Sequence, residues 1–310
     1  MVTSEQHAVV RPRRRWWPVP PSLLVGLAPL VVFVGISVWR ARPDDDYPTL
    51  GLTVDSVIRS LVIPESIAAG VLALIVTGLG WWRIATVDPT RGRPRWAALA
   101  VLVIVVVSLG RLPLIDWGEL SVRYVLLLAL GVLLVGVFEE LMTRGVLLVG
   151  LRRRLPEFWV WIASCVLFGL LHFVNALAGA ALGTTVVQVV FAASFGSALY
   201  LARRMSGSLL LPVLIHALWD FGSIGLTASG SLTTQLPLIG LLGLVSFAAL
   251  LFGIVAGGVV AWRDDAGRRL RRRWREVPSM RAFAGQGGMV GLPAGPFAAT
   301  RPALSASTRP

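Results

Sequence analysis

The sequence predicts an all-α fold, a polytopic integral membrane bundle of about eight transmembrane helices. Hydrophobic residues make up 55% of the 310-residue chain, the mean hydropathy is +0.75, and only 15% of residues are charged. Soluble domains carry about a quarter charged residues. Nearly uncharged runs of about 18 residues or more, the length that crosses a bilayer, repeat along the chain. The basic residues lie mainly in alternate gaps between these runs, as in membrane proteins.

The apolar runs give the following predicted spans, each bounded to about three residues: 22–39, 58–82, 96–115, 124–150, 158–177, 184–202, 208–227 and 236–262. Residues 1–21 form a basic segment, and because no small-x-small cleavage site follows the first span, we expect a retained anchor rather than a removed signal peptide. Residues 22–120 hold three spans, 121–227 a core of four, and 228–262 the last. Residues 263–310 begin basic and continue as a Gly-, Pro- and Ala-rich stretch that predicts a disordered tail.

The charge distribution excludes nucleic acid as a partner, although the net charge is +13. All 29 basic residues are arginines, and they lie between apolar runs rather than on one soluble face. In the predicted topology 23 of them lie on one side of the membrane and five on the other, beside the acidic run Asp44–Asp46. The positive-inside rule then places both termini in the cytoplasm. We expect anionic lipids at the cytoplasmic arginine clusters, and the lack of lysine indicates a GC-rich bacterial genome, hence a bacterial plasma membrane.

Several other chemistries are absent from the sequence. The single cysteine, Cys165, excludes a disulfide framework and a cysteine-based metal cluster, and its apolar surroundings predict a buried structural thiol. The chain has no Walker loop, dinucleotide fingerprint or HExxH motif. The hydroxyl residues of the fifth and sixth spans have no evident base partner and predict helix packing: Ser164, Thr184, Thr185 and Ser194.

A few polar residues lie within the apolar spans, where each charged group costs a few kcal/mol or more and therefore needs a reason. They are Glu139, Glu140 and Arg144 on the fourth span, His172 and Asn175 on the fifth, and His216 and Asp220 on the seventh. Counted from the cytoplasmic side at 1.5 Å per residue, Glu140, His172 and His216 fall roughly 15–21 Å deep. Three helices therefore bring carboxylates and imidazoles to one level near the middle of the membrane.

Spacings of four residues pair several of these side chains on one helix face. Glu140 and Arg144 are expected to form a salt bridge, whereas Glu139 points about 100° away and is free to face a cavity. The same spacing relates His216 to Asp220, and Phe168 to His172. Asn175 favours an interhelical hydrogen bond over a catalytic role. Pro212, four residues before His216, should kink or start its helix.

Three motifs in this order resemble the CPBP family of intramembrane proteases, which includes type II CAAX prenyl proteases and enzymes linked to bacteriocin processing and self-immunity. They are EExxxR at residues 139–144, FxxxH at 168–172 and HxxxD at 216–220. The resemblance covers about residues 121–227. Asp220 stands where the family has Asn or Asp.

The resemblance implies a hydrolase that cleaves a membrane-embedded or lipid-anchored protein or peptide. Glu139 and His172 would activate water, and His216 and Asp220 would complete the site or bind the oxyanion. Glu140 is a further catalytic candidate, and together with Arg144 it would hold the reacting side chains in position. Phe168 and Asn175 are further supporting residues. Because two histidines and a glutamate also make an open zinc site, Glu139, His172 and His216 are candidate ligands of a divalent metal such as zinc.

Two alternatives belong to other functional classes. One is a catalytically idle relative that acts as an immunity factor or a scaffold for a membrane partner, although the intact motifs argue against it. The other is a proton- or ion-coupled transporter, since buried Glu, His and Arg also line ion pathways. Neither an inverted repeat nor paired broken helices supports a transporter.

Overall fold

The computed structural model describes residues 19–40, 51–88 and 95–276. Most of the predicted basic segment 1–21, the acidic run Asp44–Asp46, and the predicted tail beyond residue 276 lie outside the described residues. The chain divides into two compact units, Met1–Asp265 and Ala266–Pro310, and the contacts below belong to the first unit.

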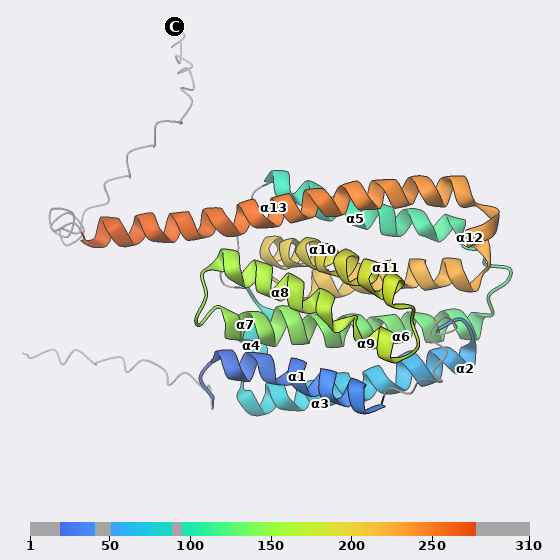
Figure 1. The fold of residues 1–310 in the computed structure, drawn as a ribbon, viewed down its shortest axis with the longest axis horizontal. Helices are drawn as coiled ribbons and strands as arrows, with labels where there is room; N and C mark the ends of the chain where they lie inside the picture. The colour runs from blue at the N-terminus through green and yellow to red at the C-terminus, as the bar shows by residue number, and fades with distance from the viewer. Residues whose placement is uncertain (1–18, 41–50, 89–94, 277–310) are drawn as a thin grey trace, which may run out of the picture. The chain divides into compact units, whose positions relative to one another are not determined.

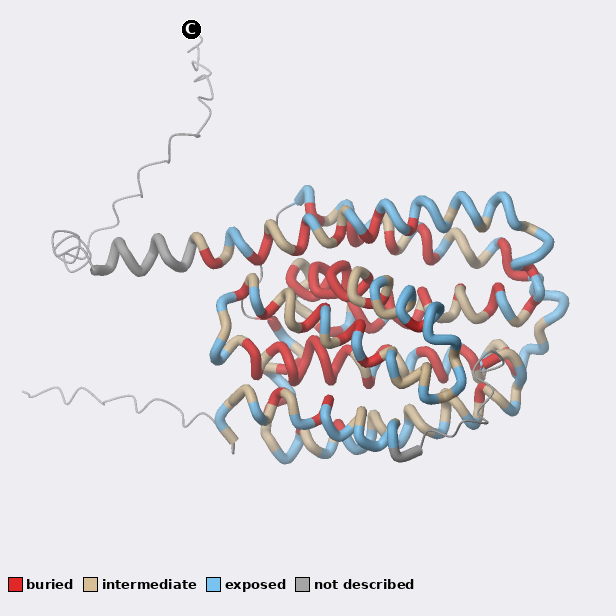
Figure 2. Tube along the Cα trace, viewed as in Figure 1, coloured by how far each residue is buried: buried red, intermediate tan, exposed pale blue. Residues whose placement is uncertain are grey.

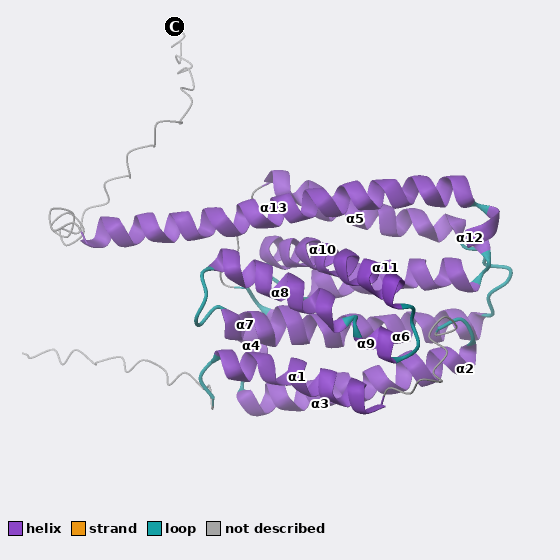
Figure 3. Cartoon of the chain, viewed as in Figure 1, coloured by secondary structure: helices purple, strands orange, loops and turns teal. Residues whose placement is uncertain are grey.

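The described chain is helical and contains no β-strand, which confirms the predicted all-α class (Figures 1 and 3). The first half comprises α1 (Leu23–Arg40), α2 (Val54–Val57), η2 (Ile58–Val62), α3 (Ile63–Leu79), α4 (Trp82–Thr86), η3 (Arg95–Ala97), α5 (Ala98–Arg111), η4 (Leu112–Leu114), α6 (Val122–Glu140), η5 (Leu141–Leu147) and α7 (Leu148–Leu151). The second half comprises α8 (Glu157–Leu171), α9 (Val174–Leu177), α10 (Leu182–Ser206), α11 (Leu210–Ala228), α12 (Ser231–Thr234) and α13 (Leu236–Glu276).

Seven helices of the described chain are long and apolar enough to cross a membrane, against about eight predicted. They are Val54–Leu79, Arg95–Leu114, Val122–Leu151, Glu157–Leu177, Leu182–Ser206, Leu210–Ala228 and Leu236–Ala266. The remaining predicted span is the shorter apolar helix Leu23–Val38. At 1.5 Å per residue this stretch measures about 24 Å, less than the ~30 Å hydrocarbon core.

Of the motif-bearing helices, α6 and α11 pack directly against each other, and α8 packs on α10 and η5. Helix α11 also contacts α5 and α10. Burial is concentrated on η5, α10 and α11, whereas α13 and α3 expose apolar faces such as Leu244 and Leu74 (Figure 2). An apolar exterior suits lipid contact, and the interior of the bundle is where membrane proteins place ionisable side chains.

Local irregularities adjust the predicted helix boundaries near the motifs. The fourth predicted span has a π-helical segment, η5, which begins directly after Glu140 and contains Arg144. The fifth is interrupted because α8 ends at Leu171 and His172 is its C-terminal cap. Helix α11 begins at Leu210, so Pro212 lies in the first turn, where the missing N–H is tolerated, and starts the helix as predicted.

A buried charge network, called here the arginine-rich cluster, joins the ends of α4, α7, α8 and α10. Its members are Asp88, Arg152, Glu157, Tyr200, Arg203 and Arg204. Arg152 donates to both carboxylates, at 3.0 Å from Asp88 Oδ2 and 2.6 Å from Glu157 Oε1. Burial works to lower the pKa of Arg152, but the Glu157 and Asp88 carboxylates outweigh it and raise that pKa above its ordinary value. The guanidinium therefore stays charged.

Candidate active site

His216 lies at the centre of the candidate active site, with carboxylates at both ring nitrogens. Its Nδ1 lies 3.1 Å from Glu140 Oε1. Its Nε2 lies 3.5 Å from Asp220 Oδ2, one turn along α11, and 3.9 Å from Glu139 Oε2 on α6. The imidazole is buried, whereas the Glu139 and Asp220 side chains keep 19% and 27% of their surface exposed. The site is therefore closed at Glu140, and its partly exposed side chains, Glu139 and Asp220, lie on the Nε2 side of His216.

Arg144 supports Glu140 from within the bundle. Its Nη1 donates to Glu140 Oε1 at 2.8 Å, which is the ion pair predicted from the spacing, and to Thr143 Oγ1 at 2.9 Å. The guanidinium carbon lies 4.0 Å from the ring centroid of Phe168, a cation–π contact. A Cβ at Gly196 would lie only 2.8 Å from Arg144 Nη2, so glycine makes room for the buried cation. Thus Glu140 Oε1 joins Arg144 to His216.

Phe168 lies between the two imidazoles. Its ring centroid is 5.5 Å from that of His172 and 5.8 Å from that of His216, both in edge-to-face geometry. His172 Nδ1 lies 3.2 Å from the carbonyl oxygen of Phe168. Because a carbonyl only accepts, Nδ1 carries the proton in a neutral ring, and Nε2 is left as an acceptor.

The structure therefore brings together the residues of the three motifs, as their calculated depths predict. Two contacts differ from the sequence-based pairing. Glu140 contacts His216 as well as Arg144, and the contact of Glu139 within the site is with His216 rather than His172. Asn175 lies apart: its Nδ2 donates to Gln188 Oε1 of α10 at 3.0 Å, the interhelical bond that its position favoured.

Two charged residues of the site escaped the sequence analysis, Glu65 on α3 and Arg111 at the end of α5. Glu65 Oε2 is buried without a hydrogen-bond partner among the described residues, and its charge interacts with those of Glu139 and His216. Arg111 lies over the ring of Trp219 and interacts with Asp220. Both lie inside predicted spans. Because a charged side chain inside a span is costly and usually has a function, the same argument that selected Glu139 would have selected these two residues.

No group of three or more His, Cys, Asp or Glu side chains in the described chain is arranged to hold an ion. Both ring nitrogens of His216 face carboxylates, and Nδ1 of His172 faces a carbonyl. Zinc at Glu139, His172 and His216 stays a prediction, and no step of the mechanism below uses it.

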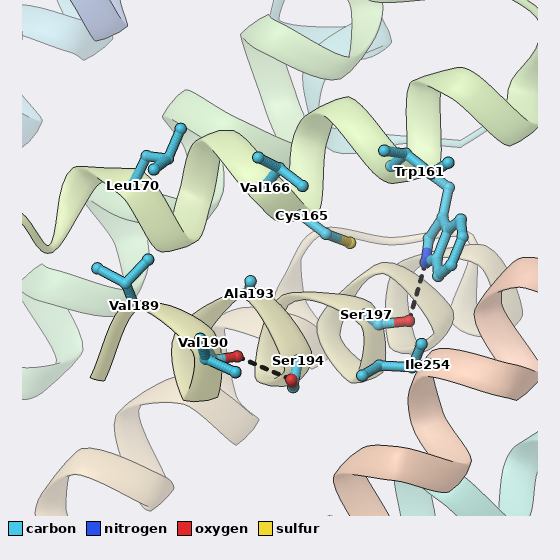
Figure 4. A pocket seen from close by; sticks show the side chains of 11 residues that line it. Trp161, Cys165, Val166, Leu170, Val189, Val190, Ala193, Ser194, Ser197 and Ile254 are labelled. Atoms are coloured by element: carbon cyan, nitrogen blue, oxygen red, sulfur yellow. Dashed lines mark hydrogen bonds between the residues drawn. The ribbon is translucent and has the colours of Figure 1, made fainter. Parts of the chain in front are cut away.

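An apolar groove of about 360 Å³ runs between α8, α10 and Ile254 of α13 (Figure 4). Its walls include Cys165, which is buried and free, as predicted for a structural thiol. Ser194 donates to its own helix at Val190 O, and Ser197 accepts from Trp161 Nε1. None of the candidate catalytic side chains lines the groove.

Comparison with known proteins gives a match to one family. Residues 121–222 match the family described as type II CAAX prenyl endopeptidase Rce1-like. The match begins one residue before α6, ends within α11, and includes the three motifs, which confirms the resemblance to CPBP/CAAX proteases. No curated protein and no solved structure matches the chain. The matched family is described as one of endopeptidases, which are hydrolases, and the match covers about a third of the chain.

Proposed function

We propose, taking as the premise that residues 121–222 match the type II CAAX prenyl endopeptidase family, that this protein is an intramembrane endopeptidase. Its substrate would be a membrane-embedded or lipid-anchored protein or peptide. The observation that carries the proposal is the buried His216 ring, with Glu140 at Nδ1 and with Asp220 and Glu139 at Nε2.

Glu139 is the general base in this proposal. Its Oε2 has no hydrogen-bond partner among the described residues and lies 3.9 Å from His216 Nε2, close enough for both atoms to bind the same water. His172, whose Nε2 is an acceptor, would help to orient that water. Glu139 takes one water proton while the water oxygen attacks the carbonyl carbon of the scissile peptide bond.

His216 would stabilise the oxyanion formed in that attack. Glu140 and Asp220 offer an acceptor at each ring nitrogen, an arrangement that suits an imidazolium with two N–H donors. Nε2–H is then available to the developing negative charge on the carbonyl oxygen. When the intermediate collapses, Glu139 returns its proton to the leaving nitrogen, and the C–N bond breaks. The second water proton passes from the new carboxylic acid to the amine, so the products are a carboxylate and an ammonium group, and one water is consumed for each bond cleaved.

The test compares cells that carry the wild-type protein with cells that carry Glu139→Gln. A membrane protein or peptide that is processed only in the wild-type cells is the candidate substrate, and its cleavage by purified protein in nanodiscs should fall about 10²–10⁴-fold in Glu139→Gln. Glu119→Gln, in an exposed loop, is the matched control. Unchanged processing in Glu139→Gln cells would favour an idle scaffold, and proton-coupled flux in liposomes would favour a transporter.

We further propose a bacterial plasma membrane location with both termini in the cytoplasm and anionic lipids bound at the arginine clusters. The 23-to-5 division of arginines supports this orientation. Reporter fusions after residues 45, 118 and 230 should report the extracytoplasmic side, and those after residues 90 and 270 the cytoplasm. A cytoplasmic signal after residue 230 would contradict this topology.

A further inference from the structure

Arg111 is a cation at the edge of the candidate active site, on a helix outside residues 121–222. It is the last residue of α5, yet its side chain packs against α11 instead of extending toward the interface. The guanidinium carbon lies 3.7 Å from the ring centroid of Trp219, the residue next to Asp220. A Cβ at Gly222 would lie 3.1 Å from Arg111 Cβ and 3.2 Å from Cδ, so glycine there lets the aliphatic stem lie on α11.

The packing around Trp219 connects this cation to the reacting groups. Trp219 packs on Phe195, with ring centroids 4.9 Å apart, and Phe195 contacts His216 edge to face at 5.7 Å. The indole of Trp219 is buried. Arg111 is thus connected to His216 through two packed aromatic side chains, those of Trp219 and Phe195.

Arg111 lacks a direct anionic partner in the described chain. Its Nη1 is buried without a hydrogen-bond partner, and none of the described carboxylates forms an ion pair with it, although Asp220 interacts with it through the charge. Arg59, at the same end of the bundle, pairs with Asp55 at 3.0 Å. A buried donor without an acceptor is costly, so native structures normally give such a group a protein, water or ligand partner.

We propose that Arg111 binds a carboxylate of the peptide substrate and positions it beside His216. This inference rests on the proposed endopeptidase function. One face of the guanidinium is covered by Trp219, which leaves the N–H groups in the guanidinium plane to bind a carboxylate with two parallel bonds. The carboxylate is the C-terminus of the substrate or an acidic side chain near the scissile bond.

The experiment uses pooled N-palmitoylated peptides in three forms and the full-length protein in nanodiscs. One form has a free C-terminal carboxylate, one a C-terminal carboxamide, and one a carboxamide with Asp scanned through the C-terminal positions. Cleavage is followed by mass spectrometry. Binding is measured separately by photocrosslinking to the Glu139→Gln variant, so the result does not depend on turnover. Variants are Arg111→Gln, Arg111→Lys and, as a matched control at the same end of the bundle, Arg59→Gln.

We expect the protein to favour a carboxylate form over the plain carboxamide about ten- to hundredfold in affinity and in kcat/KM. Arg111→Gln should remove this preference, so that the carboxylate and carboxamide forms give equal values; Arg111→Lys should retain part of it, and Arg59→Gln should behave as wild type. Preference for the free C-terminus alone, or for the Asp series alone, identifies the source of the carboxylate.

Three results would overturn the inference: equal binding of all forms, no binding of any form, or an equal loss on every form in Arg111→Gln. The last result would mean that Arg111 stabilises the oxyanion or positions Asp220, rather than binding a carboxylate of the substrate. Carboxylate-selective binding without any cleavage would support Arg111 as a carboxylate receptor and count against the endopeptidase proposal, so the two failures are distinguishable.

Discussion

The protein buries charges in two places, and the two differ in how completely the carboxylate oxygens are paired. In the arginine-rich cluster, both oxygens of Asp88 and both oxygens of Glu157 accept from Arg152. In the candidate active site, one oxygen each of Glu65, Glu139 and Glu140 is buried without a hydrogen-bond partner among the described residues. Both places contain arginine, so the difference does not come from a lack of cations.

The comparison separates a structural role from a chemical one. A carboxylate whose lone pairs are all occupied by a guanidinium stabilises the fold and has little left to offer a substrate. An unsatisfied buried carboxylate is costly, and natural proteins retain such groups mainly where they react or bind. The pairing of oxygens therefore predicts opposite effects of the same Glu→Gln change in the two places.

The largest effect on stability is expected at Glu157, in the arginine-rich cluster. Its carboxylate accepts from Arg152 and from the Tyr200 hydroxyl at 2.8 Å, and both donors are largely buried. Glu157→Gln leaves Arg152 with less compensation and should cost about 3–5 kcal/mol of unfolding free energy. Thermal unfolding in nanodiscs measures it, with the exposed pair residue Asp55→Asn as control, where about 1 kcal/mol or less is expected. Equal losses in the two variants would remove the distinction drawn above.

Glu140 combines the features of the arginine-rich cluster and of the candidate active site, because one of its carboxylate oxygens accepts hydrogen bonds and the other has no partner among the described residues. Glu140→Gln removes the charge opposite Arg144, whose side chain is 1% exposed, and loosens the hold on His216 Nδ1. We expect kcat/KM to fall about 10–100-fold, as for other residues that orient a reacting imidazole, together with a lower melting temperature. Glu139→Gln should lose more activity and no stability. Full activity in folded Glu140→Gln protein would contradict its orienting role.

A smaller effect is expected at Glu65, the unpaired carboxylate from α3. Glu65→Gln removes one of the negative charges that balance a charged His216, so we expect kcat/KM to fall roughly tenfold, or about 1.4 kcal/mol. The melting temperature should stay the same or rise, because a neutral amide costs less to bury than an unpaired carboxylate. A stability loss as large as that of Glu157→Gln would show that Glu65 is structural.

Sequence spacing predicted the site where its geometry lies within one helix. The i,i+4 rule found the Glu140–Arg144 pair and the His216–Asp220 pair, and counted depths brought their helices to one level. The second contact of Glu140, to His216 at 3.1 Å, depends on how α6 and α11 rotate against each other. Periodicity fixes which residues share a face of one helix, but not which faces of two helices meet.

Glu65 and Arg111 were missed for a related reason. Each lies within a turn or two of the end of a predicted span, where a charged side chain ordinarily reaches the interface. In the tertiary structure both lie inside: Glu65 Oε2 is buried, and Arg111 stacks on Trp219. The η5 segment was also beyond prediction, because its residues have no composition that separates a π-helical turn from an α-helical one.

The smallest effect on activity is expected from metal removal, which tests the Nε2 side of His216. Zinc binding by Glu139, His172 and His216 would require His216 Nε2 to turn from Asp220 toward an ion that His172 and Glu139 also reach. Since Nδ1 is held at 3.1 Å from Glu140 and Nε2 faces Asp220 at 3.5 Å, we expect dialysis against a chelator to leave cleavage unchanged. Mass spectrometry of the purified metal content should then show far less than one zinc per chain. Chelation of the Asp220→Asn variant is the more sensitive test of zinc binding, because this variant lacks the charge that competes with an ion for His216 Nε2. Loss of activity on chelation, with recovery on adding zinc, would contradict this expectation. It would show that the site binds zinc and that the unpaired Glu139 oxygen is a zinc ligand rather than the general base.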